Sequence, residues 1–171
     1  MKIKSLLNIL GALLSILGLT MVFPLVISLV SGQDDYIAFF YSLLLCMSIG
    51  LPCWFFTRNN KSITNREGFA IVTFSWITTA IVGALPLYLS GTIPNITDAF
   101  FESMSGVTTT GASILGNIET MPHLINGIES LPNGILFWRS FLQWIGGMGV
   151  VVFYIAILPL LGIGGVQLFK A

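Results

Sequence analysis

From Asp98 to Ser113 the sequence reads Asp-Ala-Phe-Phe-Glu-Ser-Met-Ser-Gly-Val-Thr-Thr-Thr-Gly-Ala-Ser, between two long apolar segments. The helix that it predicts, about residues 96–107, covers about 18 Å at about 1.5 Å per residue. The hydrocarbon core of a bilayer is about 30 Å thick, so this helix cannot cross it. Residues 108–112, if extended, cover about 16 Å at about 3.3 Å per residue. A short helix followed by an extended segment of similar length predicts a re-entrant pore loop.

The chemistry of this loop suits a cation. The C-terminus of a helix carries partial negative charge, which is favourable beside a dehydrated cation inside a membrane. The residues that follow can offer backbone carbonyls and threonine hydroxyls, the groups that line potassium-channel filters. Gly111 permits a positive φ that turns a carbonyl toward a pore axis. The candidate ion ligands are Thr108, Thr109, Thr110 and Gly111.

The composition of the chain is that of a membrane protein. Of its 171 residues 55% are hydrophobic and 8% are charged, whereas soluble domains are about 25% charged; the mean hydropathy is +0.93. Four apolar stretches are long enough to span a bilayer, namely residues 6–30, 36–56, 68–89 and 135–161. Pro24 is expected to kink the first of these four helices.

Charge is distributed unevenly when the four spans are threaded in order. The basic residues gather on one side: Lys2, Lys4, Arg58, Lys61, Arg66 and Lys170. The positive-inside rule therefore predicts that both termini are cytoplasmic and that the pore loop opens outside. Asp34 and Asp35, in the outer turn between the first two spans, are interpreted as incidental acids.

Three stretches carry a resemblance to a known family. Residues 97–103 and 106–112 closely resemble the first pore loop of TrkH-type bacterial potassium uptake proteins, in the Trk/Ktr/HKT superfamily. Residues 65–69 and 142–149, the latter continuing to 157–162, resemble flanking parts of the same family. The resemblance extends over nearly the whole chain, but family members carry four helix–pore loop–helix repeats and this sequence shows one.

The expected architecture is an all-α membrane protein in which a transmembrane helix hairpin precedes one pore repeat. The domains are predicted as the hairpin at residues 1–57, a basic cytoplasmic linker at 58–67 and the pore repeat at 68–171. Within the repeat we expect an outer helix at 68–89, a pore helix at 96–107, a filter at 108–112, an extracellular loop at 113–134 and an inner helix at 135–161.

Two further groups of residues are candidates for a role in the pore. Glu102 lies midway along the pore helix, where an unpaired carboxylate is costly; it could pair with Arg139 or attract cations directly. Gly146, Gly147 and Gly149 lower the stability of the inner helix by about 1 kcal/mol each relative to alanine. They could provide a packing groove or a gating hinge.

The sequence contains no pattern that is typical of an enzyme active site. It contains no nucleophile–base pattern, paired carboxylates, phosphate-binding loop or metal-ligand cluster, and His123 is its only histidine. We therefore predict neither an enzyme nor a cofactor-binding or nucleic-acid-binding protein.

The resemblance implies channel-like potassium permeation through a carbonyl-lined filter in the bacterial inner membrane, with K⁺ as the only metal ion and glycine at position 111 associated with potassium preference. It also implies a homodimer of full-length subunits and a TrkA-type cytoplasmic nucleotide-binding regulatory ring. One loop cannot surround an ion, so the chain is expected to be a fragment that is inactive alone. The alternatives are a homotetrameric single-repeat channel and a non-conducting membrane scaffold or regulatory subunit.

Overall fold

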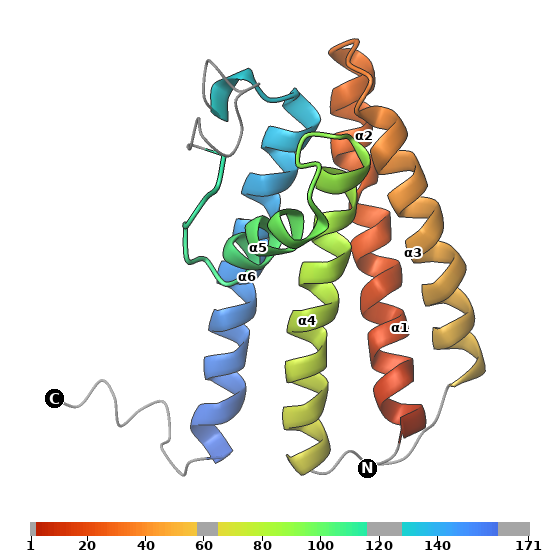
Figure 1. Ribbon diagram of the computed structural model, residues 1–171. Coiled ribbons are helices and arrows are strands. Elements are labelled where there is room, and N and C mark those ends of the chain that lie inside the picture. Colours follow the sequence, from red (N-terminus) through yellow and green to blue (C-terminus); the bar gives the residue numbers. More distant parts are fainter. Residues whose placement is uncertain (1–2, 58–64, 116–127, 161–171) are drawn as a thin grey trace, which may run out of the picture.

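The computed structural model describes residues 3–57, 65–115 and 128–160, and these ranges are helical with short connections. The elements are α1 (Ile3–Thr20), α2 (Val22–Val30), α3 (Tyr36–Phe56), α4 (Asn65–Leu89), α5 (Ile96–Val107), the 3₁₀ turn η1 (Ile128–Ser130) and α6 (Asn133–Leu160). The long helices stand side by side, and α5 lies across them (Figure 1). Four stretches are long and apolar enough to cross a membrane: Ile3–Val30, Tyr36–Phe56, Glu67–Leu89 and Asn133–Val152.

Helices α1 and α3 form a tightly packed hairpin because small residues line their contact. A Cβ on Gly11 would lie 2.6 Å from the backbone nitrogen of Trp54, and one on Gly50 would lie 2.6 Å from Ser15 Oγ. Glycine at both positions lets the two backbones approach more closely than any side chain would allow.

The first span is interrupted between α1 and α2, one turn before Pro24. A proline has no N–H to donate to the carbonyl four residues earlier, here that of Thr20, so the helix is weakened there. Met21 closes the break with a tighter bond, its N–H donating to the carbonyl of Gly18 at 3.0 Å. The kink expected from Pro24 is thus a short break in the helix.

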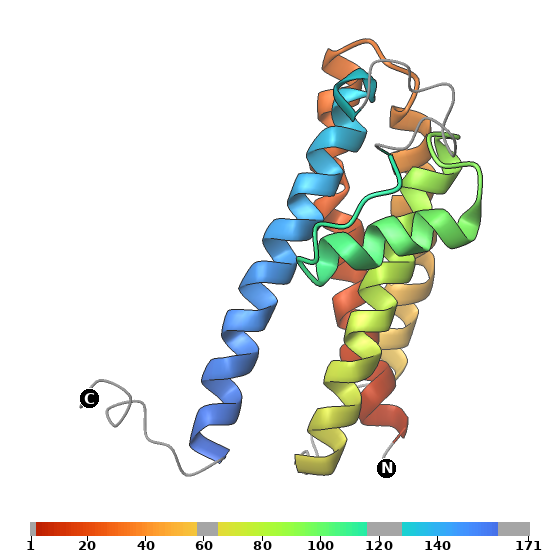
Figure 2. The same ribbon diagram turned by 60° about the vertical axis from the view of Figure 1, so that its left-hand side comes forward.

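The pore unit consists of α4, α5 and α6. Helix α5 crosses at about the middle of the bundle, strongly inclined to α4 and α6, and the chain then climbs back beside it (Figure 2). Asn95 caps α5, its Oδ1 accepting from the N–H of Thr97 at 3.0 Å. Because α5 is inclined rather than upright, it reaches less deeply along the bundle than the length of the predicted pore helix suggests.

Two element boundaries differ from those predicted. Helix α4 begins at Asn65, inside the predicted linker at 58–67, and α6 begins at Asn133, inside the predicted loop at 113–134. Most of that linker and the middle of that loop, with His123, lie outside the described residues.

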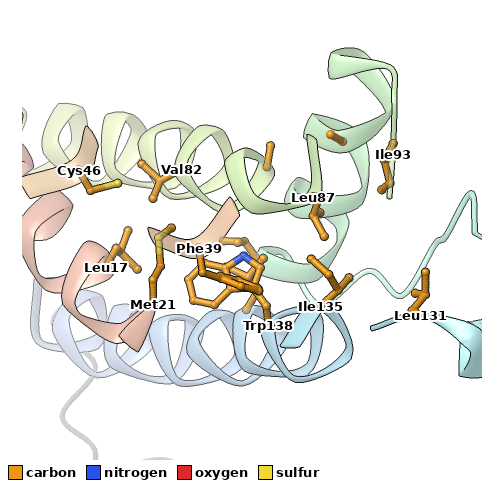
Figure 3. Close-up of a cluster of buried hydrophobic side chains, with 14 of the residues drawn as sticks. Leu17, Met21, Phe39, Cys46, Val82, Leu87, Ile93, Leu131, Ile135 and Trp138 are labelled. Carbon is orange, nitrogen blue, oxygen red and sulfur yellow. The ribbon is translucent and has the colours of Figure 1, made fainter. Parts of the chain in front are cut away.

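One apolar core joins the hairpin to the pore unit. Phe39 of α3 and Trp138 of α6 are fully buried and meet edge to face, with ring centroids 6.2 Å apart (Figure 3). Trp138 Nε1 also donates to the carbonyl of Gly83 in α4 at 3.0 Å. Helix α6 is therefore fixed to both neighbours in its N-terminal half.

Candidate functional site

Helix α5 ends in a Schellman motif at the start of the predicted filter. The N–H of Thr109 donates to the carbonyl of Gly106 at 3.0 Å, and that of Thr110 donates to the carbonyl of Ser105 at 3.0 Å. Thr109 has a φ of +56°, the left-handed conformation that this motif requires. Two carbonyls at the end of the helix are thereby satisfied without water.

The expectation of an extended run from residue 108 was therefore wrong for its first part. Helix α5 ends at Val107, and Thr108, with φ −80° and ψ 0°, forms a turn with Thr109 before the irregular segment begins. Capping the carbonyls of the last helical turn uses the N–H groups of Thr109 and Thr110, which keeps these residues at the helix end. The return segment, irregular rather than helical, comprises residues 110–113.

The sign of φ alternates along the predicted filter. It is negative at Thr108 and positive at Thr109 and at Gly111, where it is +76°; Thr110 between them is not among the positive-φ residues. The backbone therefore changes direction at residues 109 and 111, within the exposed segment. The carbonyl and hydroxyl oxygens of such a segment are the kind of ligand that lines cation filters.

The three threonine hydroxyls donate their protons within the loop. Thr108 Oγ1 donates to the carbonyl of Met104 at 2.8 Å, and Thr109 Oγ1 donates to the carbonyl of Thr108 at 2.7 Å. Thr110 Oγ1 lies 2.8 Å from Thr108 Oγ1 and must be the donor, since the proton of Thr108 is already used. Lone pairs of these oxygens remain for a cation or water. Residues 108–113 are exposed in the described part of the chain.

The structure brings Glu102 and Arg139 together. Arg139 of α6 donates from both Nε, at 3.0 Å, and Nη2 to Glu102 Oε1. The side chain of Glu102 is only 3% exposed. A carboxylate buried so deeply needs such a partner, because removing an ion from water costs several kcal/mol.

Glu102 also anchors the segment that follows the filter. Ser113 Oγ lies 3.0 Å from Oε1 and 3.1 Å from Oε2, and the N–H of Ile114 donates to Oε2 at 3.2 Å. Ser105 holds the same segment by donating from Oγ to the carbonyl of Ala112 at 2.6 Å. Sequence reasoning missed these bonds because nothing in the pattern pairs residues 102 and 113.

A polar cavity of about 120 Å³ lies between α5, the return segment and α6. Its lining includes Glu102 and Arg139, and Gly111 opens onto it. Water can occupy a cavity of this size when polar groups line it. The side of the return segment that faces α5 and α6 thus borders a polar cavity large enough for water.

The three glycines of the inner helix differ in their surroundings. A Cβ on Gly146 would lie 1.8 Å from the carbonyl oxygen of Val107, so α6 touches the end of α5 directly. Cβ atoms on Gly147 and Gly149 would make only ordinary contacts, at 3.9 Å from Thr109 Cγ2 and 4.0 Å from Trp76. Gly146 serves close packing, and the hinge stays a hypothesis.

Four membrane-length helices and a half-length helix that ends in a polar return segment define a multi-pass membrane protein with a re-entrant pore loop. The family model described as "TrkH: Cation transport protein" matches residues 36–171. The chain belongs to this family, which is one of transporters rather than enzymes.

Curated relatives match the chain along its whole length. It is 41% identical over 174 residues to the Trk system potassium uptake protein TrkH of Vibrio parahaemolyticus and 42% identical to that of Escherichia coli K12; both alignments cover 100% of this chain and 34% of the relative. The chain is 36% identical to the Trk system potassium uptake protein TrkG of E. coli K12, in an alignment that covers 94% of this chain and 32% of TrkG.

A solved structure has the same fold. The crystal structure of the potassium transporter TrkH from V. parahaemolyticus matches with a TM-score of 0.82 and 38% identity, over 96% of this chain and 34% of that one. The chain thus spans about a third of the length of the relatives that it matches.

Proposed function

We propose that this chain supplies the first pore loop of a Trk-type potassium uptake subunit. K⁺ passes down its electrochemical gradient through a filter to which Thr108, Thr109, Thr110 and Gly111 contribute oxygens. The observation that carries this proposal is the exposed, oxygen-rich segment at residues 108–113, which follows the C-terminus of a helix too short to span. The relatives that the chain matches are named as potassium uptake proteins, which supports the choice of ion.

The chemistry of the loop suits a large monovalent cation. Its oxygens are neutral carbonyls and hydroxyls, which replace the weakly held water of K⁺ without a strong charge that would trap it. Glu102 supplies no free charge to the ion, because Arg139 neutralises it. In this mechanism Glu102 and Arg139 position the loop, and the ion contacts only the neutral oxygens of the filter.

The partners and the location follow from the same proposal. We place the protein in the bacterial inner membrane with both termini cytoplasmic, as the distribution of basic residues suggests. A homodimer of full-length subunits and a TrkA-type nucleotide-binding ring are the partners that the family resemblance implies. One loop cannot surround an ion, and residues 108–113 are exposed in this chain; the family resemblance implies that three further loops complete the filter.

The proposal is tested by growth of a bacterium deficient in potassium uptake at low external K⁺. We expect growth with a version that carries all four repeats and none with this chain alone. Gly111→Ser in the complete version should reduce Rb⁺ uptake and its preference over Na⁺, since position 111 needs a positive φ.

Gly91→Ala is the matched control for that substitution. Gly91 has a φ of +72° and nothing within 4 Å of its Cβ position, but it lies outside the filter. It introduces the same kind of backbone strain and should leave ion preference intact. Unchanged uptake and preference in Gly111→Ser would reject the filter assignment and favour a non-conducting scaffold.

A further inference from the structure

The outer turn of the hairpin reaches the first residues of α6. The N–H of Asn133 donates to Gln33 Oε1 at 2.8 Å, and Asn133 Nδ2 donates to Ser31 Oγ at 3.1 Å. Gln33 thus acts as an N-terminal cap for a helix that begins 100 residues later in the chain. The hairpin, predicted as a separate addition, holds the outer end of the inner pore helix.

Two N–H groups of the first turn of α6 still lack an acceptor. Asn133 donates to Gln33, and Leu136 donates to the carbonyl of Pro132 at 3.0 Å. The N–H groups of Gly134 and Ile135 have no acceptor among the described residues, and both residues are buried. A buried donor without an acceptor costs about 1–3 kcal/mol, so these groups need a partner.

Two polar side chains at the same place also lack partners among the described residues. Asp35, interpreted from the sequence as an incidental acid, is only 6% exposed, and neither of its carboxylate oxygens has a hydrogen-bond partner there. The Ser28 hydroxyl is fully buried and has no partner in the described part of the chain either. A Cβ on Gly134 would lie 2.0 Å from Ser28 Oγ and 2.6 Å from Asp35 Oδ2, so both oxygens point at the start of α6.

Water fits these four groups better than a cation does. A cation would bind the oxygens of Asp35 and Ser28 but would face two N–H groups of like polarity. The start of α6 and the start of α3, which Asp35 precedes, both carry partial positive charge that balances the carboxylate. A water molecule can accept from an N–H and donate to the carboxylate at once, and buried waters characteristically make about three such bonds.

We propose that an ordered water molecule is bound between Asp35, Ser28 and the N–H groups of Gly134 and Ile135, and that it completes the capping of α6 by the hairpin turn. Asp35 and Ser28 are then positioning residues for the inner pore helix. The water site fixes the position of α6 along the hairpin. Because Arg139 belongs to α6, this position also places its side chain beside Glu102.

The sign of a stability change tests this site. We expect Ser28→Ala and Asp35→Leu each to lower the melting temperature of a version with all four repeats in lipid nanodiscs, because each removes a hydrogen-bond partner of the water. If the two side chains were simply unpartnered, their apolar replacements would be neutral or would raise the melting temperature. Asp34→Leu is the matched control, since Asp34 is an exposed neighbour and its replacement should change little.

A second measurement guards against a loss of stability from poor packing of leucine. A high-resolution density map should show one peak within hydrogen-bond distance of Asp35, Ser28 Oγ and an N–H of α6, and this peak should be lost in Ser28→Ala. A dry site, a coordinated ion, or a higher melting temperature in Ser28→Ala would overturn the proposal. Neither measurement involves transport, so the outcome is independent of the proposed function.

Discussion

Thr109 holds a backbone conformation that its side chain opposes. A branched Cβ crowds the carbonyl in the left-handed region, at a cost of about 1–2 kcal/mol. Among the described residues it is the only non-glycine residue with a positive φ. Glycine, the usual residue at this point of a Schellman motif, would avoid the cost, so the threonine is retained at the expense of stability.

Replacing Thr109 by glycine should stabilise the fold. We expect Thr109→Gly to raise the free energy of unfolding by about 1 kcal/mol, because the left-handed strain is relieved. Denaturant or thermal unfolding in lipid measures this. Thr110→Gly is the control: Thr110 is not strained in this way, so the added chain entropy should lower stability instead. Equal effects of the two changes would contradict the strain argument.

The pair of Glu102 and Arg139 should behave as one unit. Arg139→Gln alone should cost about 3–5 kcal/mol, because it leaves the buried Glu102 carboxylate without its partner. Glu102→Gln alone should cost less, because the side chain of Arg139 is 21% exposed. The double variant should cost clearly less than the sum of the two, and a double-mutant cycle of unfolding free energies measures the difference. Additive costs would mean that the pair is not coupled.

Ser113→Ala offers a smaller perturbation of the same network. It removes the hydroxyl donor to Glu102 and leaves the arginine bond in place. We expect a loss of about 1 kcal/mol. The change should also loosen the segment after the filter, visible as faster hydrogen exchange of the Ile114 amide, which donates to the same carboxylate. Unchanged exchange would show that Ser113 does not anchor the segment.

At the level of elements, the junction of α5 and α6 depends on one glycine of three. Gly146→Ala would place a Cβ 1.8 Å from the carbonyl oxygen of Val107, a contact between rigid backbones that no side-chain movement can relieve. We expect a loss of several kcal/mol or a failure to fold, measured by unfolding in lipid.

Gly147→Ala and Gly149→Ala are the controls for this junction. Their Cβ atoms would have ordinary contacts, so helix propensity should dominate and stability should rise by up to about 1 kcal/mol. If both were stable but impaired in Rb⁺ uptake, the hinge hypothesis would gain its first support. If all three alanine variants destabilised equally, the contact with Val107 would not explain the glycine.

At the level of the whole molecule, hydropathy and helix length predicted the arrangement of elements well. The apolar stretches located the four spans, and the bounds of α5 equal those of the predicted pore helix. Gly111 has the positive φ that its residue type suggested. These features depend on local composition, which a sequence displays directly.

The features that were missed depend on contacts between distant segments. Threonine disfavours the left-handed region, so no local preference predicts that Thr109 is the left-handed residue that follows the end of α5. The burial of Asp35 arises because α6 begins against the hairpin turn, and the need for Gly146 arises from the position of Val107. None of these contacts leaves a periodic pattern in the chain.

Assembly is the remaining prediction at this scale. In mild detergent we expect the chain alone to give monomers or polydisperse particles in native mass spectrometry, because we propose that its exposed loop is completed by the other repeats of a longer subunit. A defined tetramer would contradict this and would favour four identical single-repeat subunits around one pore. Crosslinking in membranes before extraction excludes dissociation by detergent.

The direct backbone contact between Gly146 and Val107 has a mechanical consequence. Because no side chain separates the two backbones, α6 cannot rotate or slide at that level without displacing the C-terminal end of α5. Motion of the C-terminal half of this helix must therefore either bend α6 beyond the contact or displace residues 108–113, the segment that we propose lines the ion path.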